Sequence, residues 1–107
     1  MDLTKLSCQP YKEGTLPLNN DEIDLYVSEL KPDWNVLENY KIEKEFTFKN
    51  FKQTMNFVNR IADIAEEENH HPVMHVFYGK VTIELWTHSV SGLSPNDFIL
   101  AAKIDAI

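Results

Sequence analysis

Residues 49 to 68 carry apolar side chains at the spacing of an amphipathic α-helix. Apolar positions recur there at steps of three and four, which places them on one face of a helix. They are Phe51, Met55, Val58, Ala62 and Ala65, with Phe57, Ile61 and Ile64 broadening the stripe. His71 precedes Pro72, and the residue before a proline is kept out of the helical conformation by a steric clash. The helix is therefore expected to end by about His70, and the chain then to become extended.

The extended segment that follows, residues 73 to 88, is predicted to form a β-hairpin. Its sequence, VMHVFYGKVTIELWTH, is rich in strand-forming residues on both sides of a glycine. With Gly79 and Lys80 as the two central residues of a type II′ turn, Tyr78 pairs with Val81. This register decides which side chains of the hairpin face each other.

In this register His71 lies opposite His88. Alternate residues of a strand point to opposite faces, so one face of the hairpin is apolar and is expected to pack against helices. That face carries Met74, Val76, Tyr78, Val81, Ile83 and Leu85. The other face carries Val73, His75, Phe77, Thr82, Glu84 and Trp86, with the two histidines at its end.

Two more elements are predicted before the long helix. Residues 19 to 30 begin with Asn and Asp, which favour helix N-termini, and the helix stops at the Lys31-Pro32 pair. Residues 34 to 48 contain two runs of strand-forming residues, which indicate a hairpin that turns near Asn39.

A last helix is predicted near the C-terminus. Ser94 stands as its N-cap, Pro95 at its first position and Asp97 at its third, a pattern that resembles a capping box. Apolar residues run nearly all the way round this helix. One face must cover the sheet, and Ile99, Ala106 and Ile107 would remain for another subunit, although a fold-back of the chain could also cover them.

The order of these elements is α-β-β-α-β-β-α. It predicts an α+β fold with a single antiparallel four-stranded sheet and three helices on one face. A chain of 107 residues can build one core of ordinary size. We therefore expect an irregular N-terminal arm over residues 1–19 and a single domain over residues 20–107, assembled as a homo-oligomer.

Composition narrows the classes of function. Ten basic and seventeen acidic side chains give a net charge of −7, which disfavours direct binding to nucleic acid. No segment is apolar over the length of a membrane span, and the first twenty residues lack the apolar run of a signal peptide. Cys8 has no partner cysteine, which suits a reducing compartment. The protein is expected to be cytoplasmic.

Residues 66 to 75, EEENHHPVMH, form the main candidate site. A metal site is disfavoured, because adjacent histidines in extended chain point to opposite sides and no HExxH motif is present. Acid/base chemistry fits better, since imidazole gives and takes protons near neutral pH. Glu66 stands one helical turn before His70, where its carboxylate could orient the ring. The alternative is a solvated helix end that happens to hold histidines.

Nucleophilic catalysis finds little support. Cys8 is remote in sequence, and Ser89, Ser91 and Ser94 lie in no GxSxG-like turn. Trp86 and Phe77, on the histidine face, would suit stacking on a flat heterocycle, although aromatic residues on a sheet face more often belong to an interface or a core.

The segments ENHHP, YGKVTIELWTH and GLSPNDFILAAKID resemble the pterin-4a-carbinolamine dehydratase family over about residues 20 to 107. The family pattern has a glutamate four residues before His-His-Pro, then an aromatic residue, a Thr-His pair and an aspartate at set distances. The matching positions are Glu66, His70, His71, Pro72, Tyr78, Thr87, His88 and Asp97.

The resemblance implies an activity: removal of water from 4a-hydroxytetrahydropterin to give quinonoid dihydropterin, which recycles the cofactor of aromatic amino acid hydroxylases. No metal or organic cofactor is implied, because the pterin is the substrate. The implied catalytic residues are His70, His71, His88 and Glu66. The implied substrate-binding residues are His70, His71, Pro72, Thr87 and His88.

Within that set, His70 and His88 are cast as acid/base groups and His71 as a substrate-binding group, with Glu66 supporting His70. Asp97 is interpreted as a helix N-terminal group, and His75 is left out of the catalytic set. Val73 and Asn69 stand where the family often has acidic residues, which affects the expected pterin contacts. The resemblance also leaves two alternatives: a dimerisation or coactivator-type binding module, and a different pterin, such as one in molybdopterin metabolism.

Overall fold

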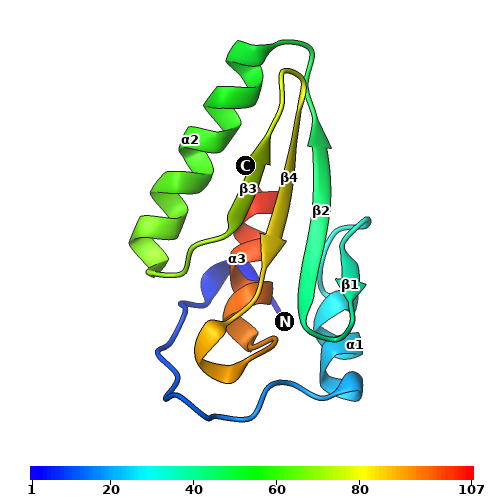
Figure 1. Ribbon diagram of the computed structural model, residues 1–107, viewed down its shortest axis with the longest axis vertical. Coiled ribbons are helices and arrows are strands. Elements are labelled where there is room, and N and C mark those ends of the chain that lie inside the picture. Colours follow the sequence, from blue (N-terminus) through cyan, green and yellow to red (C-terminus); the bar gives the residue numbers. More distant parts are fainter.

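The protein, described by a computed structural model over residues 1–107, alternates helices with pairs of strands (Figure 1). Two short 3-10 helices, Leu3–Lys5 and His88–Val90, accompany the main elements. The helices are α1 (Asn20–Ser28), α2 (Phe51–Glu68) and α3 (Pro95–Asp105). The strands are β1 (Asn35–Leu37), β2 (Lys41–Thr47), β3 (Val73–Val76) and β4 (Lys80–Leu85).

The four strands form one sheet in the order β1-β2-β4-β3, with every neighbouring pair antiparallel. The helices pack on one face of the sheet, and the other face is open toward the viewer in Figure 1. The predicted α+β class, element order and single four-stranded sheet are confirmed. No helix of the structure has the length and apolar character needed to cross a membrane.

The core lies between the sheet and the helices. Ile42 of β2 and the alternate residues Val81, Ile83 and Leu85 of β4 are fully buried. They pack against the apolar residues of α3. Every residue of that helix from Asn96 to Ala101 is buried. A helix that is apolar nearly all round is a core helix, and α3 occupies that position here.

The prediction that α3 leaves Ile99 for another subunit is wrong. Ile99 is only 4% exposed within the single chain. The Leu3–Lys5 helix of the N-terminal arm packs against α3, and Leu3 is 1% exposed. A fold-back of the chain therefore covers this side of α3.

The predicted helix ends agree with the capping chemistry. Helix α2 ends at Glu68, and Asn69 follows in the left-handed conformation with φ 51°. At the start of α3, Ser94 and Asp97 form the expected capping box, and Pro95 occupies the first turn. These two ends position the candidate site.

The buried line of α2 differs from the predicted centre of its stripe. Thr54, Phe57, Ile61 and Ala65 are buried, whereas Phe51 is half exposed. The Phe57 ring packs against aromatic rings at the end of β2, and Thr54 donates a hydrogen bond to the Tyr78 carbonyl. These contacts with the sheet set the rotation of the helix about its axis.

The predicted register of the second hairpin is wrong by two residues. Val76 pairs with Val81, and the Phe77 N–H bonds to the Lys80 carbonyl, so Tyr78 and Gly79 occupy the turn. The Phe48 N–H bonds to the Gly79 carbonyl, and together with Thr54 it fixes the turn from outside the hairpin.

This shift has two consequences. A slip of two residues keeps every side chain on its predicted face, so Val81, Ile83 and Leu85 face the helices as expected, but Tyr78 is 69% exposed at the turn. The predicted pairing of His71 with His88 is also wrong, because β4 ends at Leu85 and His88 belongs to a 3-10 helix.

Candidate active site

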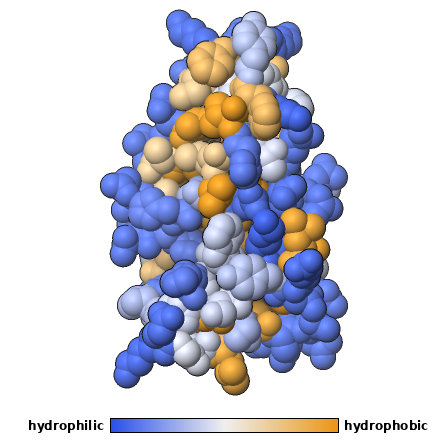
Figure 2. Space-filling model, viewed as in Figure 1, coloured by the Kyte–Doolittle hydropathy of each residue, from blue (hydrophilic) through white to orange (hydrophobic).

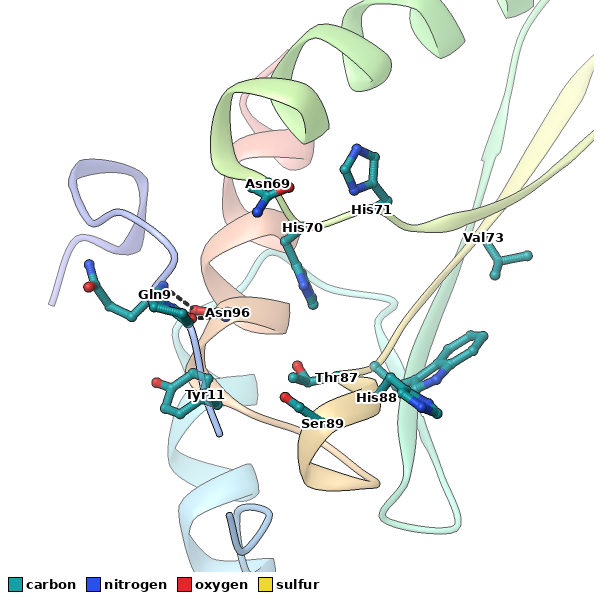
Figure 3. A pocket seen from close by; sticks show the side chains of 12 residues that line it. Gln9, Tyr11, Asn69, His70, His71, Val73, Thr87, His88, Ser89 and Asn96 are labelled. Atoms are coloured by element: carbon teal, nitrogen blue, oxygen red, sulfur yellow. Dashed lines mark hydrogen bonds between the residues drawn. The ribbon is translucent and has the colours of Figure 1, made fainter. Parts of the chain in front are cut away.

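A pocket of about 500 Å³ lies at the end of the sheet where α2 ends and α3 begins (Figure 3). Four segments line it: the N-terminal arm, the connection from α2 to β3, the turn after β4 and the first turn of α3. The lining residues are Gln9, Pro10, Tyr11, Asn69, His70, His71, Val73, Trp86, Thr87, His88, Ser89 and Asn96. A volume of this size suits a small-molecule ligand.

The structure brings most of the predicted site residues into this pocket. His70, His71, Thr87 and His88 all line it, although they come from two separate segments. Pro72 and Glu66 do not line it. Pro72 marks the change of direction between α2 and β3.

His70 is held by a buried carboxylate. Its Nε2 atom lies 2.6 Å from Asp97 Oδ1, and the side chains are 12% and 0% exposed. From the sequence we had interpreted Asp97 as a helix N-terminal group. It does form the capping box of α3, and it also contacts His70.

Three donors surround the carboxylate of Asp97. Besides His70 Nε2, the Thr87 hydroxyl donates to Oδ2 at 2.8 Å and the Ser94 N–H donates to Oδ2 at 3.0 Å. Thr87 Oγ1 and Ser94 Oγ lie 2.7 Å apart. A buried carboxylate needs such a set of donors to replace its hydration, and this set holds Asp97 in one orientation.

The contact with Asp97 decides which nitrogen of His70 is available. A carboxylate accepts hydrogen bonds, so Nε2 carries a hydrogen atom and donates a hydrogen bond to Oδ1. Nδ1 is then the nitrogen that can accept a proton from a ligand or return it. The arrangement makes His70 an oriented acid/base group.

Glu66 does not support His70 as predicted. Its carboxylate lies 2.5 Å from His71 Nε2, and both side chains are largely exposed, at 78% and 54%. The spacing of Glu66 and His70 would place them on one helical face only if the helix continued to His70. Asn69, in the left-handed conformation, ends the helix before that residue. The connection then directs His70 toward α3 and leaves His71 beside Glu66.

His88 lies on an exposed turn across the pocket from His70 in Figure 3. The turn is short and well defined: the Thr87 N–H bonds to the Gly92 carbonyl at 2.8 Å, and the Ser91 N–H bonds to the His88 carbonyl at 3.0 Å. Ser91 caps the turn with φ 52°. Two imidazoles therefore flank the same space from different segments.

Trp86 and Val73 supply an apolar wall beside the histidines. Phe77 stands on the same face of the sheet but lies at the far end of the hairpin. His75 contacts Glu84 on the open face of the sheet and does not line the pocket. The pKa of Glu84 is lowered by its hydrogen bonds from Lys41 and His75. This cluster is separate from the pocket.

Sequence reasoning missed the contribution of the N-terminal arm. Gln9, Pro10 and Tyr11 line the pocket, and Asn96 lines it from α3. No spacing in the sequence links residues 9 to 11 with residue 96. The family pattern singled out the position of Asp97, but nothing in the sequence indicated its contact with His70.

Metal-ligating side chains do not gather in the pocket. No group of three or more His, Cys, Asp or Glu residues has the geometry to hold a metal ion. The histidines of the pocket are instead engaged with carboxylates or exposed to the open space.

Comparisons with known proteins agree with this site. The sequence profile of the family described as "Pterin 4 alpha carbinolamine dehydratase" matches residues 16–107. A protein of Alkaliphilus metalliredigens is 46% identical over 97% of this chain and 94% of its own length. One of Rickettsia canadensis is 43% identical over 97% and 95%. The names of both provisionally assign them to the pterin-4-alpha-carbinolamine dehydratases.

Two solved structures have the same fold. A transcriptional coactivator/pterin dehydratase from Brucella melitensis is 30% identical, with a TM-score of 0.79 over 84% of this chain and 96% of that one. A pterin dehydratase-like protein described as a RuBisCO assembly factor in the alpha-carboxysome is 25% identical, with a TM-score of 0.61 over 69% and 87%. By profile, by relatives and by fold, this chain belongs to the pterin-4a-carbinolamine dehydratase family.

Proposed function

We propose that the protein is a hydro-lyase that removes water from 4a-hydroxytetrahydropterin to give quinonoid dihydropterin. The observation that carries this proposal is the pair of imidazoles at one pocket, with His70 oriented by the buried Asp97 and His88 exposed on the other side. Family membership supplies the substrate class.

The reaction needs two proton transfers. The C4a–O bond breaks while a proton reaches the departing hydroxyl, and the N5–H electrons form the C4a=N5 double bond as N5 loses its proton. One group must deliver a proton and another must remove one, and the balance is the loss of one water. Two positioned imidazoles can perform both transfers without a cofactor.

The site residues take different roles in this proposal. His70 and His88 are the acid/base groups, and His71 binds the substrate at the rim. Thr87 is committed to Asp97 and Ser94, so it shapes the pocket by holding Asp97. Trp86 offers an aromatic surface for the flat pterin ring. Pro72 aligns the two histidines by directing the chain from α2 into β3.

The test is the rate of carbinolamine breakdown. Purified protein should accelerate the appearance of quinonoid dihydropterin from 4a-hydroxytetrahydropterin generated in the assay. His70→Ala and His88→Ala should lose most of this acceleration, whereas His75→Ala, which changes a histidine outside the pocket, should keep it. Wild-type protein that is no faster than buffer would contradict the proposal.

The physiological role and assembly belong to the same proposal. We infer recycling of the pterin cofactor of aromatic amino acid hydroxylases, in the cytoplasm, where the free thiol of Cys8 would stay reduced. We also infer a homo-oligomer, a dimer or tetramer. Its support is the unpaired edge of β3 and the exposed apolar residues at the hairpin end, Val76 and Phe77, where Figure 2 shows apolar side chains gathered. Sedimentation of the purified protein tests the assembly.

A protein-binding role is the second candidate. The Brucella relative is described as a transcriptional coactivator as well as a dehydratase, and the exposed apolar end of the hairpin offers a surface for a partner. Such a role would depend on Phe77 and not on the pocket. A phenotype lost in Phe77→Ser but kept in His88→Ala would favour it. Activity on a different pterin, such as one in molybdopterin metabolism, would appear as turnover in a substrate panel.

A further inference from the structure

The N-terminal arm lines one side of the histidine pocket. Residues 9 to 11 line the pocket, and they lie outside the part of the chain that the family profile matches, residues 16–107. The arm therefore adds a wall that the profile-matched segment, residues 16–107, does not itself supply. Figure 3 shows Gln9 and Tyr11 on the opposite side of the pocket from His88.

The arm is fastened to the same helix ends that hold His70 and Asp97. The Cys8 N–H donates to Glu68 Oε1 at 2.8 Å, at the last residue of α2. The Gln9 N–H donates to Asn96 Oδ1 at 2.9 Å, and Asn96 Nδ2 donates to the Gln9 carbonyl at 2.7 Å. Asn96 directly precedes Asp97, so the arm is tied to the element that orients the catalytic imidazole.

A second anchor lies beside His88. The Gly14 N–H donates to the carbonyl of Ser89 at 3.0 Å, and the Leu18 N–H donates to the carbonyl of Leu93 at 2.9 Å. Pro17 packs so closely on Gly92 that a Cβ atom there would lie 2.9 Å from the proline. Residues 9 to 14 therefore run from an anchor at Asn96, beside Asp97, to an anchor at Ser89, beside His88.

Gly14 allows the arm to change direction between these anchors. Its φ is 85°, and the Thr15 N–H bonds to the Lys12 carbonyl at 3.0 Å, which closes a turn over residues 12–15. A positive φ at the third position of a turn is the conformation that glycine adopts without strain. The turn keeps residues 9 to 11 facing the histidines.

Tyr11 presents its ring to this space. In Figure 3 its hydroxyl oxygen lies on the side of the ring remote from Thr87 and Ser89. Burial raises the pKa of Tyr11, so the phenol stays neutral at physiological pH. The side chain thus offers an apolar ring surface to a ligand, on the side of the pocket opposite His88.

We propose that residues Gln9 to Tyr11 form a wall of the substrate site and that the Tyr11 ring contacts the bound pterin and sets its KM. This inference rests on the proposed dehydratase function. Tyr11 takes no part in proton transfer, so it acts on binding and leaves the chemical step to the histidines.

The test compares Tyr11→Ala and Tyr11→Phe with Lys12→Ala, an exposed neighbour that does not line the pocket. KM and kcat are measured with 4a-hydroxytetrahydropterin, and Kd is measured by calorimetry with 7,8-dihydrobiopterin. Tyr11→Ala should raise KM and Kd by about fivefold to tenfold, because it removes an aromatic contact, while kcat stays within about twofold. Tyr11→Phe and Lys12→Ala should match the wild type.

Gly14→Ala is the second variant, because it strains the turn and shifts the arm without removing a side chain that lines the pocket. It should also raise KM and Kd. Unchanged KM and Kd in both Tyr11→Ala and Gly14→Ala, with normal wild-type turnover, would overturn the inference and leave the dehydratase standing. Wild-type protein without turnover would contradict the dehydratase itself. If the wild type has no turnover, equal affinities of the wild type and Tyr11→Ala for 7,8-dihydrobiopterin would overturn the inference that the Tyr11 ring contacts the pterin.

Discussion

His70 Nε2 lies 2.6 Å from the carboxylate of Asp97, a residue 27 positions away on the first turn of α3. Asp97 makes two kinds of contact: it completes the capping box of α3, and it holds the His70 imidazole in one orientation and one tautomer. The strength of the helix cap and the geometry of the site are therefore linked through one buried side chain.

Asp97→Asn should lower kcat by roughly 10²-fold or more, the range in which general acid/base groups contribute. The introduced amide oxygen can still accept from the Ser94 N–H and the Thr87 hydroxyl, but its NH₂ group would face His70 Nε2. The ring would then have to move its proton to Nδ1, the nitrogen needed by the ligand. Steady-state kinetics measure the loss, and a Tm close to that of the wild type would exclude unfolding as its cause.

Glu66→Gln should leave kcat within about fivefold of the wild type. The contact of Glu66 with His71 is largely exposed, and even a charged pair at such a position contributes about 0–1 kcal/mol. The same assay provides the measurement, with Asp97→Asn as the matched comparison. A loss as large as that of Asp97→Asn would contradict this prediction and would mean that the contact of Glu66 with His71 also supports catalysis.

His88→Ala should lower kcat by roughly 10²- to 10⁴-fold and leave Tm nearly unchanged, because His88 is exposed on its turn. The measurements are kcat and KM with thermal unfolding of the same preparation. If only KM rises, His88 binds the pterin without transferring a proton.

The thiol of Cys8 should react slowly in the native protein. Burial, followed by the nearby Glu68 carboxylate, raises the pKa of Cys8 to about 12, and the thiolate is the reactive form. Reaction with a disulfide reagent such as DTNB at about pH 8 should therefore be much faster after addition of denaturant. A fast reaction of the native protein would show that the arm leaves its position over Asn96.

Glu68→Gln should lower stability at neutral pH. The hydrogen bond from Lys103 and that from the Cys8 N–H lower the pKa of Glu68 below its ordinary value of 4.5. A depressed pKa contributes stability above about pH 4.5 that is lost as the pH falls through the folded-state value. The variant should lose roughly 1–3 kcal/mol at neutral pH, measured by urea unfolding, and the difference should shrink in acid. Glu67→Gln, an exposed neighbour, is the control.

The local signals of the sequence were informative at helix ends. Pro72 predicted the end of α2, because it excludes the residue before it from the helical conformation. Ser94 with Asp97 predicted the start of α3, because capping bonds join residues two to four positions apart. The faces of the second hairpin also followed from its sequence, since alternation survives a slip of two residues. The register did not, because Phe48 and Thr54 fix the turn from outside the hairpin.

The candidate site divides in the same way. The histidines that line the pocket were identified by their pattern and by family resemblance, yet their partners were not. Glu66 met the spacing rule for His70, but the left-handed Asn69 redirected the chain and gave that carboxylate to His71. The tie between Asn96 and the arm likewise joins residues 87 positions apart.

The sequence by itself determined the elements, their order and the residues able to transfer protons, because periodicity, caps and side-chain chemistry are local properties. Only the tertiary structure decided that Asp97 orients His70, that the Leu3–Lys5 helix packs on α3 and Ile99 is buried within the chain, and that the arm lines the pocket. These contacts depend on how the helix ends and the sheet pack together, and that packing is set by the whole buried core at once.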